Sequence, residues 1–241
     1  MMPLRSPNPL SRDMALFLDL DGTLATIAPL PSDVQPNSER NALLMRLREF
    51  LDGRLAVVSG RTIFDVDRIL NGSVIAVAGT HGLERRSASG EIHRTPPHPR
   101  LADARNALAA LARTRAGSLL EDKGASVALH YRSVPQAEDE IRALGRNLAE
   151  ATGLSLQEGK MVIELRTPGP GKGDAIAAFM DEAPFKGARP VFLGDDLTDE
   201  HGFELVECAG GEGVLVGSPR ETHASRGLTD VDAVLAWLSD Y

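Results

Sequence analysis

The sequence has little cysteine, no long apolar run and no excess of basic charge, and each absence excludes a class of protein. Cys208 is the only cysteine, so no disulfide forms within the chain, which favours a reducing compartment. No stretch approaches the length of a membrane-spanning helix, and the first residues lack the apolar centre of a signal peptide. We therefore expect a cytoplasmic protein with no membrane partner.

The charge balance of the chain is acidic. Its 241 residues carry 26 Lys and Arg against 34 Asp and Glu, a formal net charge of −8. A nucleic-acid-binding protein would carry a basic face, so the sequence predicts no nucleic-acid partner. An anionic substrate is compatible with this charge, because local cations and a metal decide its binding. A chain of 241 residues suits one large domain or a core with a smaller inserted one, and 42% apolar residues are enough for a buried core.

Short, continuously apolar segments alternate with helical patterns in residues 1–83 and 166–241. This order is typical of buried strands joined by crossover helices in a parallel α/β sheet. Strands are predicted at 14–18, 55–58, 74–78, 191–193 and 214–216, and helices from Asn37 or Ser38, from Thr62, and around 230–239.

The pattern between these two parts is different. Tight glycine turns separate short strands, which favours an antiparallel sheet. Helices are predicted at about 99–114 and 135–152, and strands at 118–121, 126–131, 154–157 and 161–166. The sequence therefore predicts a small α+β unit at 84–165, inserted into an α/β core formed by 1–83 and 166–241.

Polar segments follow three of the core strands: Asp19-Leu20-Asp21-Gly22-Thr23, Ser59-Gly60-Arg61 and 194–200. Ligands bind outside the carboxyl ends of parallel strands, so we expect these segments to meet at one site. A carboxylate can attack a phosphoryl group, and a second can move the proton. Carboxylates this close need a proton or a divalent cation between them. The segments predict magnesium-dependent phosphoryl transfer; an acidic turn without chemistry is the alternative for the first segment alone.

The acids at 195–199 have two other interpretations. Helix capping is one, because acids favour helix starts. A calcium EF-hand loop is excluded, since Leu197 stands at its third position and no glycine or terminal glutamate falls in register. Magnesium, which takes a few carboxylates plus waters and substrate oxygens, accounts better for an acidic strand end facing Asp19 and Asp21.

Gly171-Lys172-Gly173 resembles a phosphate loop but is not a Walker sequence. Arg166 stands where the first glycine belongs, and Gly173 replaces the Ser or Thr after the lysine. A lysine at a helix N-terminus still suits an anion. A solvated surface lysine is the alternative.

Taken in order, these motifs resemble those of the haloacid-dehalogenase-type phosphatases: Asp-Leu-Asp-Gly-Thr, a strand ending in Ser, a lysine, and Gly-Asp-Asp. The resemblance implies a Rossmann-like parallel-sheet core with an inserted α+β cap that covers the site and selects the substrate. It makes Asp19 the nucleophile and Asp21 the general acid and base, with Ser59 and Lys172 on the phosphoryl group. It also implies Mg²⁺ held by the Asp19 side chain, the Asp21 backbone carbonyl and Asp195, with support from Asp196 and Asp199.

Further segments narrow the resemblance to the trehalose-6-phosphate phosphatases, over nearly the whole chain from residue 14. They are Ser59-Gly60-Arg61, Gly79-Thr80-His81-Gly82, Glu121-Asp122-Lys123, His130-Tyr131-Arg132 and 194–200. This resemblance implies a sugar-phosphate substrate and a trehalose-6-phosphate synthase as functional partner. It places these residues against the substrate: Gly60, Arg61, Glu121, Lys123, His130, Arg132, Lys160 and Glu164.

Several alternatives stay open. The charged residues at 121, 123 and 132 would also suit a solvated sheet face with cross-strand ion pairs, and His81 and His130 would suit structural roles. Among enzymes, the alternatives are a capped phosphatase for sucrose phosphate, mannosyl-phosphoglycerate or a hexose phosphate, and a phosphomannomutase-like transferase. A catalytically silent sugar-phosphate sensor is the alternative from another class, and the unbroken core motifs argue against it.

Overall fold

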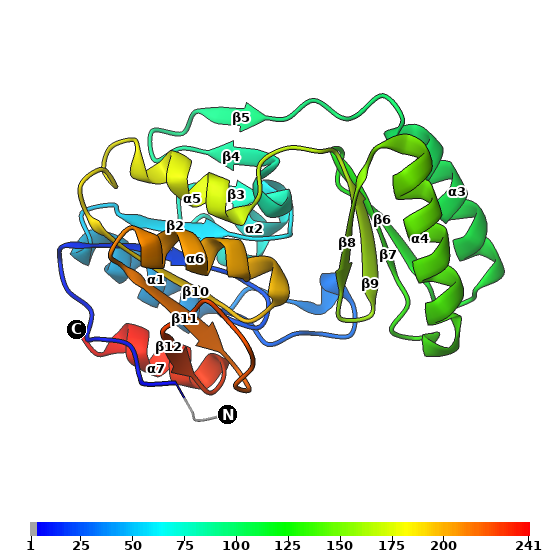
Figure 1. Cartoon of the computed structure of the whole chain (residues 1–241). Helices are drawn as coiled ribbons and strands as arrows, with labels where there is room; N and C mark the ends of the chain where they lie inside the picture. Colours follow the sequence, from blue (N-terminus) through cyan, green and yellow to red (C-terminus); the bar gives the residue numbers. More distant parts are fainter. Residues whose placement is uncertain (1–3) are drawn as a thin grey trace. The chain divides into compact units, whose positions relative to one another are not determined.

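The computed structural model describes residues 4–241, which divide into two compact units. The larger unit comprises 4–93 and 170–241, and the smaller one is Arg94–Gly169. Each unit is built around a sheet of its own (Figure 1). The predicted class, an α/β parallel-sheet core with an inserted α+β domain, is confirmed.

Eight strands form the sheet of the larger unit, in the order β12-β11-β10-β1-β2-β3-β4-β5. The pairs from β12 to β3 are all parallel, whereas β4 is antiparallel to β3. The bounds of these strands are β1 (Met14–Leu18), β2 (Leu55–Val58), β3 (Ala76–Gly79), β4 (Glu84–Arg86), β5 (Ile92–Arg94), β10 (Arg189–Gly194), β11 (Glu212–Val216) and β12 (Arg226–Leu228).

Helices cover both faces of the parallel part of this sheet, which explains why its strands are continuously apolar. In β1, Leu16 and Leu18 point into one core, and Ala15 and Phe17 point into the other. The first core is shared with α1 (Ser38–Phe50), α2 (Ile63–Leu70) and α7 (Val231–Ser239). The second is shared with α5 (Lys172–Met180) and α6 (Glu200–Cys208).

Two helix starts that the sequence predicts are confirmed by their caps. The Asn37 side chain accepts a hydrogen bond from the Arg40 backbone N–H at the start of α1 (2.9 Å). The Thr62 hydroxyl accepts one from the Asp65 N–H at the start of α2 (3.1 Å). Each cap satisfies a backbone donor that a helix N-terminus would otherwise leave unpaired, so both helices begin at defined residues.

The smaller unit has an antiparallel sheet in the order β6-β7-β9-β8. Two helices pack against one face of it (Figure 1), over a core that includes Val127, Leu129, Ile163 and Leu165. Strand side chains alternate, so Glu121, Ala128, Glu164 and Gln157, which lie opposite one another, form a row on the other face. The bounds are α3 (Leu101–Thr114), β6 (Leu119–Asp122), β7 (Ser126–His130), α4 (Glu138–Thr152), β8 (Ser155–Gly159) and β9 (Val162–Arg166).

The smaller unit begins later in the chain than the sequence analysis placed it. That analysis put the insertion at 84–165, whereas the compact unit is Arg94–Gly169. The difference arises because β4 and β5 extend the sheet of the larger unit beyond β3. Their polar side chains give no strand-like alternation in the sequence.

Within the described part of the chain, no helix has both the length and the apolar character needed to cross a membrane.

Candidate active site

The three polar segments start at the carboxyl ends of three neighbouring strands. β1 lies between β10 and β2 in the sheet. Asp19 follows the last residue of β1, Ser59 follows that of β2, and Asp195 follows that of β10. Because parallel strands end at the same edge, the sheet itself gathers these side chains, as the sequence analysis expects.

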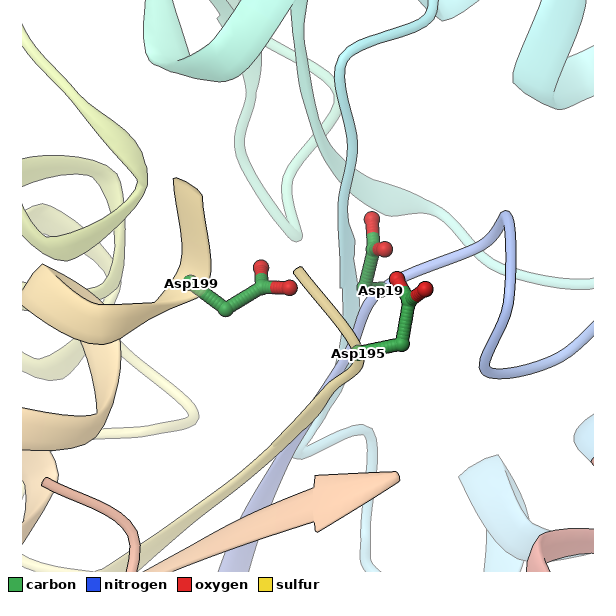
Figure 2. A group of neighbouring side chains, drawn as sticks. All are labelled: Asp19, Asp195 and Asp199. Carbon is green, nitrogen blue, oxygen red and sulfur yellow. The ribbon is translucent and has the colours of Figure 1, made fainter. Parts of the chain in front are cut away.

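A cluster of three carboxylates occupies this edge. Asp19, Asp195 and Asp199 each place a carboxylate oxygen within 4.8 Å of the others. Asp19 and Asp199 are buried, and Asp195 is partly exposed. Figure 2 shows Asp199 extending from the start of α6 toward the other two side chains. A ligand would therefore approach this cluster from the side of Asp195, its partly exposed member.

Lys172 is the cation of the cluster. Its Nζ lies 3.0 Å from Asp19 Oδ1 and 2.7 Å from Asp199 Oδ1. The side chain is only 3% exposed, which rules out the solvated surface lysine. Lys172 is the first residue of α5, so the helix N-terminus and the ammonium present positive charge at the same place.

The ionisation of this pair follows from its burial. Burial raises the pKa of Asp19 well above its ordinary value; the Lys172 ammonium opposes that rise, and neighbouring carboxylates add to it. Burial alone would lower the pKa of Lys172, but Asp19 and Asp199 outweigh it and raise that pKa. Lys172 therefore stays protonated. Its single positive charge does not balance the three neighbouring carboxylates.

The donor set suits a hard divalent cation. Mg²⁺ binds through one or two carboxylates, with waters and phosphate oxygens in its other positions. Asp19 and Asp195 offer such carboxylates. The raised pKa of Asp19 is what a buried carboxylate shows when its charge is not yet balanced. Both oxygens of Asp199 already accept hydrogen bonds, Oδ1 from Lys172 and Oδ2 from the Asp196 N–H, which fits a supporting place better than a direct ligand.

Gly22 allows the turn after β1 to pass directly against Asp195. The backbone of Gly22 has a φ of +82°, which non-glycine residues rarely adopt. A Cβ at this position would lie 2.3 Å from Asp195 Oδ2, closer than any packed contact. The turn is closed by a hydrogen bond from Gly22 N–H to the Ala25 carbonyl (2.7 Å). The absence of a side chain at Gly22 thus lets the segment Asp19–Thr23 pack against the segment 194–200.

Asp21 forms a paired salt bridge with Arg61. Arg61 Nε lies 2.6 Å from Asp21 Oδ2, and Nη2 lies 2.8 Å from Oδ1. The Arg61 backbone N–H donates to the Ser59 hydroxyl oxygen at 3.2 Å. The sequence analysis assigned Arg61 to the substrate, and it gave no signal of this contact between residues 40 positions apart.

The segment after β3 holds the loop that carries Ser59. The His81 N–H donates to the Ser59 carbonyl (2.9 Å), and the Thr80 N–H donates to the Arg61 carbonyl (2.7 Å). Both Thr80 and His81 have positive φ angles, 48° and 56°, which is unusual for residues with a side chain. The His81 ring faces Gly60 so closely that a Cβ there would lie 2.6 Å from the ring. The structural role for His81, which the sequence left open, is the one these contacts support.

Asp196 caps the turn that leads to Asp199. Its side chain accepts a hydrogen bond from the Leu197 N–H (2.9 Å), while its own N–H donates to Asp199 Oδ2 (3.0 Å). The capping interpretation of the acidic segment therefore holds for Asp196. The sequence missed Arg220, whose Nη2 donates to the Asp196 carbonyl at 2.9 Å, and Glu200, which pairs with Arg220.

In the smaller unit, the predicted substrate residues fall into two groups. The first lies on the sheet face opposite the helices. There Lys123 Nζ and Ser126 Oγ donate to Glu164 at 2.7 and 2.6 Å, and His130 Nε2 lies 2.8 Å from Glu121 Oε2. Burial acts to raise the pKa of Glu121, but His130 and Lys123 outweigh it and lower that pKa. The ion pairs that the sequence raised as an alternative are thus present.

The second group comprises Arg132 and Lys160, which are exposed at the end of the same sheet. Arg132 Nη2 donates to the Lys160 carbonyl at 3.2 Å. Neither residue belongs to the row formed by Glu121 and Glu164. Their assignment to the substrate stays a prediction.

Comparison with known proteins agrees with this site. Residues 17–230 match the trehalose-phosphatase family. The chain belongs to that family. A trehalose-6-phosphate phosphatase from Escherichia coli (strain K12) is 42% identical over 238 residues, covering 98% of this chain and 89% of the relative. The resemblance that the motifs indicate is therefore confirmed.

Solved structures of the family share the fold. The crystal structure of a trehalose-6-phosphate phosphatase related protein has a TM-score of 0.77 at 26% identity, covering 94% of this chain and 95% of its own. The Candida albicans trehalose-6-phosphate phosphatase C-terminal domain has a TM-score of 0.82 at 20% identity, covering 98% and 97%. Both structural matches cover residues of the larger and of the smaller unit of this chain.

Proposed function

We propose that this chain is a magnesium-dependent phosphatase that hydrolyses trehalose 6-phosphate to trehalose and phosphate. The family match and the name of the E. coli relative support the substrate. The observation that carries the chemistry is the buried bridge of Lys172 between Asp19 and Asp199, beside Asp195 at the carboxyl edge of the sheet.

In the first step, an Asp19 oxygen attacks phosphorus. The bond between phosphorus and the sugar oxygen breaks, and that oxygen takes a proton from Asp21 as trehalose departs. Lys172 balances charge at the phosphoryl group, and the Ser59 hydroxyl hydrogen-bonds one of its oxygens. The product of this step is an aspartyl-phosphate on Asp19.

In the second step, water attacks the phosphorus of the aspartyl-phosphate. Asp21, now ionised, accepts a proton from that water, and the bond to Asp19 breaks to release phosphate. The Asp19 and Asp195 side chains and the Asp21 backbone carbonyl would hold Mg²⁺, with Asp196 and Asp199 in support. When bound, the ion supplies positive charge that offsets the phosphate and the crowded carboxylates.

The two units take separate tasks in this proposal. The larger unit carries the phosphoryl chemistry, and the smaller unit selects the sugar. Glu121, Lys123 and Glu164 would exchange their mutual contacts for sugar hydroxyls, because a site built to bond hydroxyls rejects sugars that leave it unpaired. His130, Arg132, Lys160 and Gly60 would complete the substrate contacts. A trehalose-6-phosphate synthase would supply the substrate.

The test is phosphate release from trehalose 6-phosphate with Mg²⁺, with the Asp19→Asn variant beside wild type. The variant keeps the shape of the side chain but removes the nucleophile, so it should bind substrate and release no phosphate. Asp13→Asn, at the exposed position just before the same strand, is the matched control and should retain activity. Full activity in D19N would contradict the mechanism.

A panel of sugar phosphates separates the remaining candidates. Release from sucrose phosphate, mannosyl-phosphoglycerate or a hexose phosphate in preference to trehalose 6-phosphate would assign another substrate to the same chemistry. Transfer of the phosphate to a second sugar position, with none released, would indicate a mutase. Tight binding of trehalose 6-phosphate and Mg²⁺ with neither outcome would indicate a sensor.

A further inference from the structure

Arg61 and Asp21 form the most closely matched ion pair at the candidate active site. Two guanidinium nitrogens meet the two carboxylate oxygens, at 2.6 and 2.8 Å. The Arg61 side chain is 9% exposed and that of Asp21 is 33% exposed. Such paired, charge-assisted bonds fix both the distance and the plane of a carboxylate, which a single lysine charge would not do.

Arg61 is itself held by three hydrogen bonds, two to backbone groups and one to a side-chain hydroxyl. Its Nη1 donates to the Pro31 carbonyl at 2.8 Å, and its own carbonyl accepts from the Thr80 N–H at 2.7 Å. Its N–H donates to the Ser59 hydroxyl oxygen at 3.2 Å. The guanidinium is therefore placed by the loop after β2 and the loop before α1, before any substrate arrives.

The Asp21 carboxylate depends more on an orienting partner than the Asp19 carboxylate does. Asp19 is buried and bonded to Lys172, whereas Asp21 lies in the turn after the strand and is partly exposed. A general acid or base has to lie within hydrogen-bond reach of the oxygen it serves, and misplacement is costly in rate. Arg61 removes the rotational freedom that would misplace the Asp21 carboxylate.

We propose that Arg61 is a positioning residue that holds the Asp21 carboxylate in place when it acts as base toward the water of the second step, rather than a residue that contacts the substrate. The inference rests on the proposed function, because it takes Asp21 as the proton acceptor of that reaction. It assigns to Arg61 a different task from the one the resemblance implies.

The first test is a double-mutant cycle on trehalose 6-phosphate. Arg61→Gln should lower kcat by about 10²-fold with little change in KM, because it disturbs a proton transfer and not binding. Asp21→Asn should lower kcat at least as much. Adding R61Q to D21N should cause no further loss, since residues that act through one another are not additive. The proposal would be overturned if the losses of the two single variants multiplied in the double variant, or if R61Q mainly raised KM.

The second test uses p-nitrophenyl phosphate, whose leaving group departs without a proton. R61Q should release the first equivalent of p-nitrophenolate at the wild-type rate, because Asp21 is not needed for that departure. Later turnovers should be slow, because the water in the second step still needs Asp21 as its base. A slowed first turnover would show that Arg61 acts on the phosphoryl group and would overturn the proposal.

Two further variants separate positioning from stability. Arg86→Gln breaks a similar paired bridge, to Asp67 (2.7 and 2.7 Å), in the same unit, and should leave both activities unchanged. Arg61→Lys keeps the charge and stays available if R61Q fails to fold. A lysine offers one point charge in place of the fork, so R61K should recover only part of kcat. Full recovery by R61K would overturn the paired-donor role.

Failure of the inference is distinguishable from failure of the proposed function. If wild type released no phosphate from trehalose 6-phosphate, the substrate assignment would fall. The p-nitrophenyl phosphate experiment would still show whether Arg61 acts through Asp21. If wild type hydrolyses the sugar phosphate and R61Q behaves like R86Q, only the role of Arg61 falls.

Discussion

Glu164 receives two donors on one carboxylate in the smaller unit. Lys123 Nζ lies 2.7 Å from one oxygen, and Ser126 Oγ lies 2.6 Å from the other. The carboxylate is 6% exposed, so its charge is balanced by these contacts and not by water. A sugar hydroxyl that replaced one of these two donors would hydrogen-bond to a carboxylate whose position is already fixed.

We predict that Glu164→Gln lowers kcat/KM for trehalose 6-phosphate by about 10- to 100-fold, the usual worth of a hydrogen bond to a charged group. Activity on p-nitrophenyl phosphate, which has no sugar, should change little. Steady-state kinetics on both substrates measure the difference. Glu158→Gln is the control, because Glu158 lies on the same sheet but pairs with Arg142 of α4. Equal losses on the two substrates would contradict a role in sugar selection.

Single residues at strand ends could be predicted from the sequence, but their partners could not. Asp19, Ser59 and Asp195 follow apolar runs, and a parallel sheet brings such positions together whatever the details. The bond between Arg61 and Asp21 depends on rotamers across 40 positions of chain. No local pattern encodes a contact of that kind.

The loop between β11 and β12 supports the acidic segment from outside. Arg220 Nη2 donates to the Asp196 carbonyl at 2.9 Å, and the Glu200 carboxylate also accepts from the His223 N–H (2.8 Å) and the Thr222 hydroxyl (3.1 Å). Burial acts to raise the pKa of Glu200, but these donors outweigh it and lower that pKa. Glu200 therefore stays ionised and fixes the start of α6, one residue after Asp199.

We predict that Arg220→Gln weakens Mg²⁺ binding by about 10-fold, as loss of an outer hydrogen bond to a metal loop commonly does. Titration calorimetry with MgCl₂ alone measures it without reference to turnover. Arg113→Gln, at an exposed position of α3, controls for the lost charge. Unchanged Mg²⁺ affinity in R220Q would show that the acidic segment holds its shape without this support.

At the scale of elements, buried strands were predictable and polar edge strands were not. β1 and β2 match the predicted 14–18 and 55–58 because burial on both faces demands continuous apolar runs. β4, β5 and β12 each have three residues, none fully buried, so the sequence shows neither alternation nor an apolar run. Their pairing is decided by the sheet edge that they extend.

Across the larger unit, Glu212 joins the start of the chain to the edge of the sheet. It accepts from the Asn8 N–H at 3.2 Å, and its oxygens lie 3.1 Å from Arg189 and 3.5 Å from Arg226. Burial alone would raise the pKa of Glu212, but the Asn8 hydrogen bonds and the two arginines outweigh it and lower that pKa. The ionised carboxylate thus stabilises the folded state.

The sign of the pH dependence follows. Because the folded pKa lies below the ordinary 4.5, the contribution is fully present above pH 4.5 and is lost as the pH falls toward the folded value. We predict that Glu212→Gln lowers Tm by roughly 2–4 °C at pH 7, and that the gap to wild type narrows below the ordinary pKa. Thermal unfolding across pH measures the gap, with the exposed Glu204→Gln as control. A gap that widens in acid would contradict it.

At the scale of the whole chain, the sequence predicts two units but not their junctions. The change from parallel to antiparallel patterns reflects the separate hydrophobic cores of the two units, which are visible as a change of period. The junctions at 93 and 169 fall outside the apolar patterns that mark the two units.

The Gly22 backbone packs directly against the Asp195 carboxylate, with no room for a Cβ between them. This close approach limits how the sequences of the family can diverge. A mutation that adds a side chain at position 22 displaces the carboxylate at 195, although the two positions are far apart in the sequence. A side chain at position 22 would therefore disturb the carboxylate cluster of Asp19, Asp195 and Asp199. Natural variants should therefore change the two positions together or leave both untouched, and a library that randomises only one of them should return few active clones.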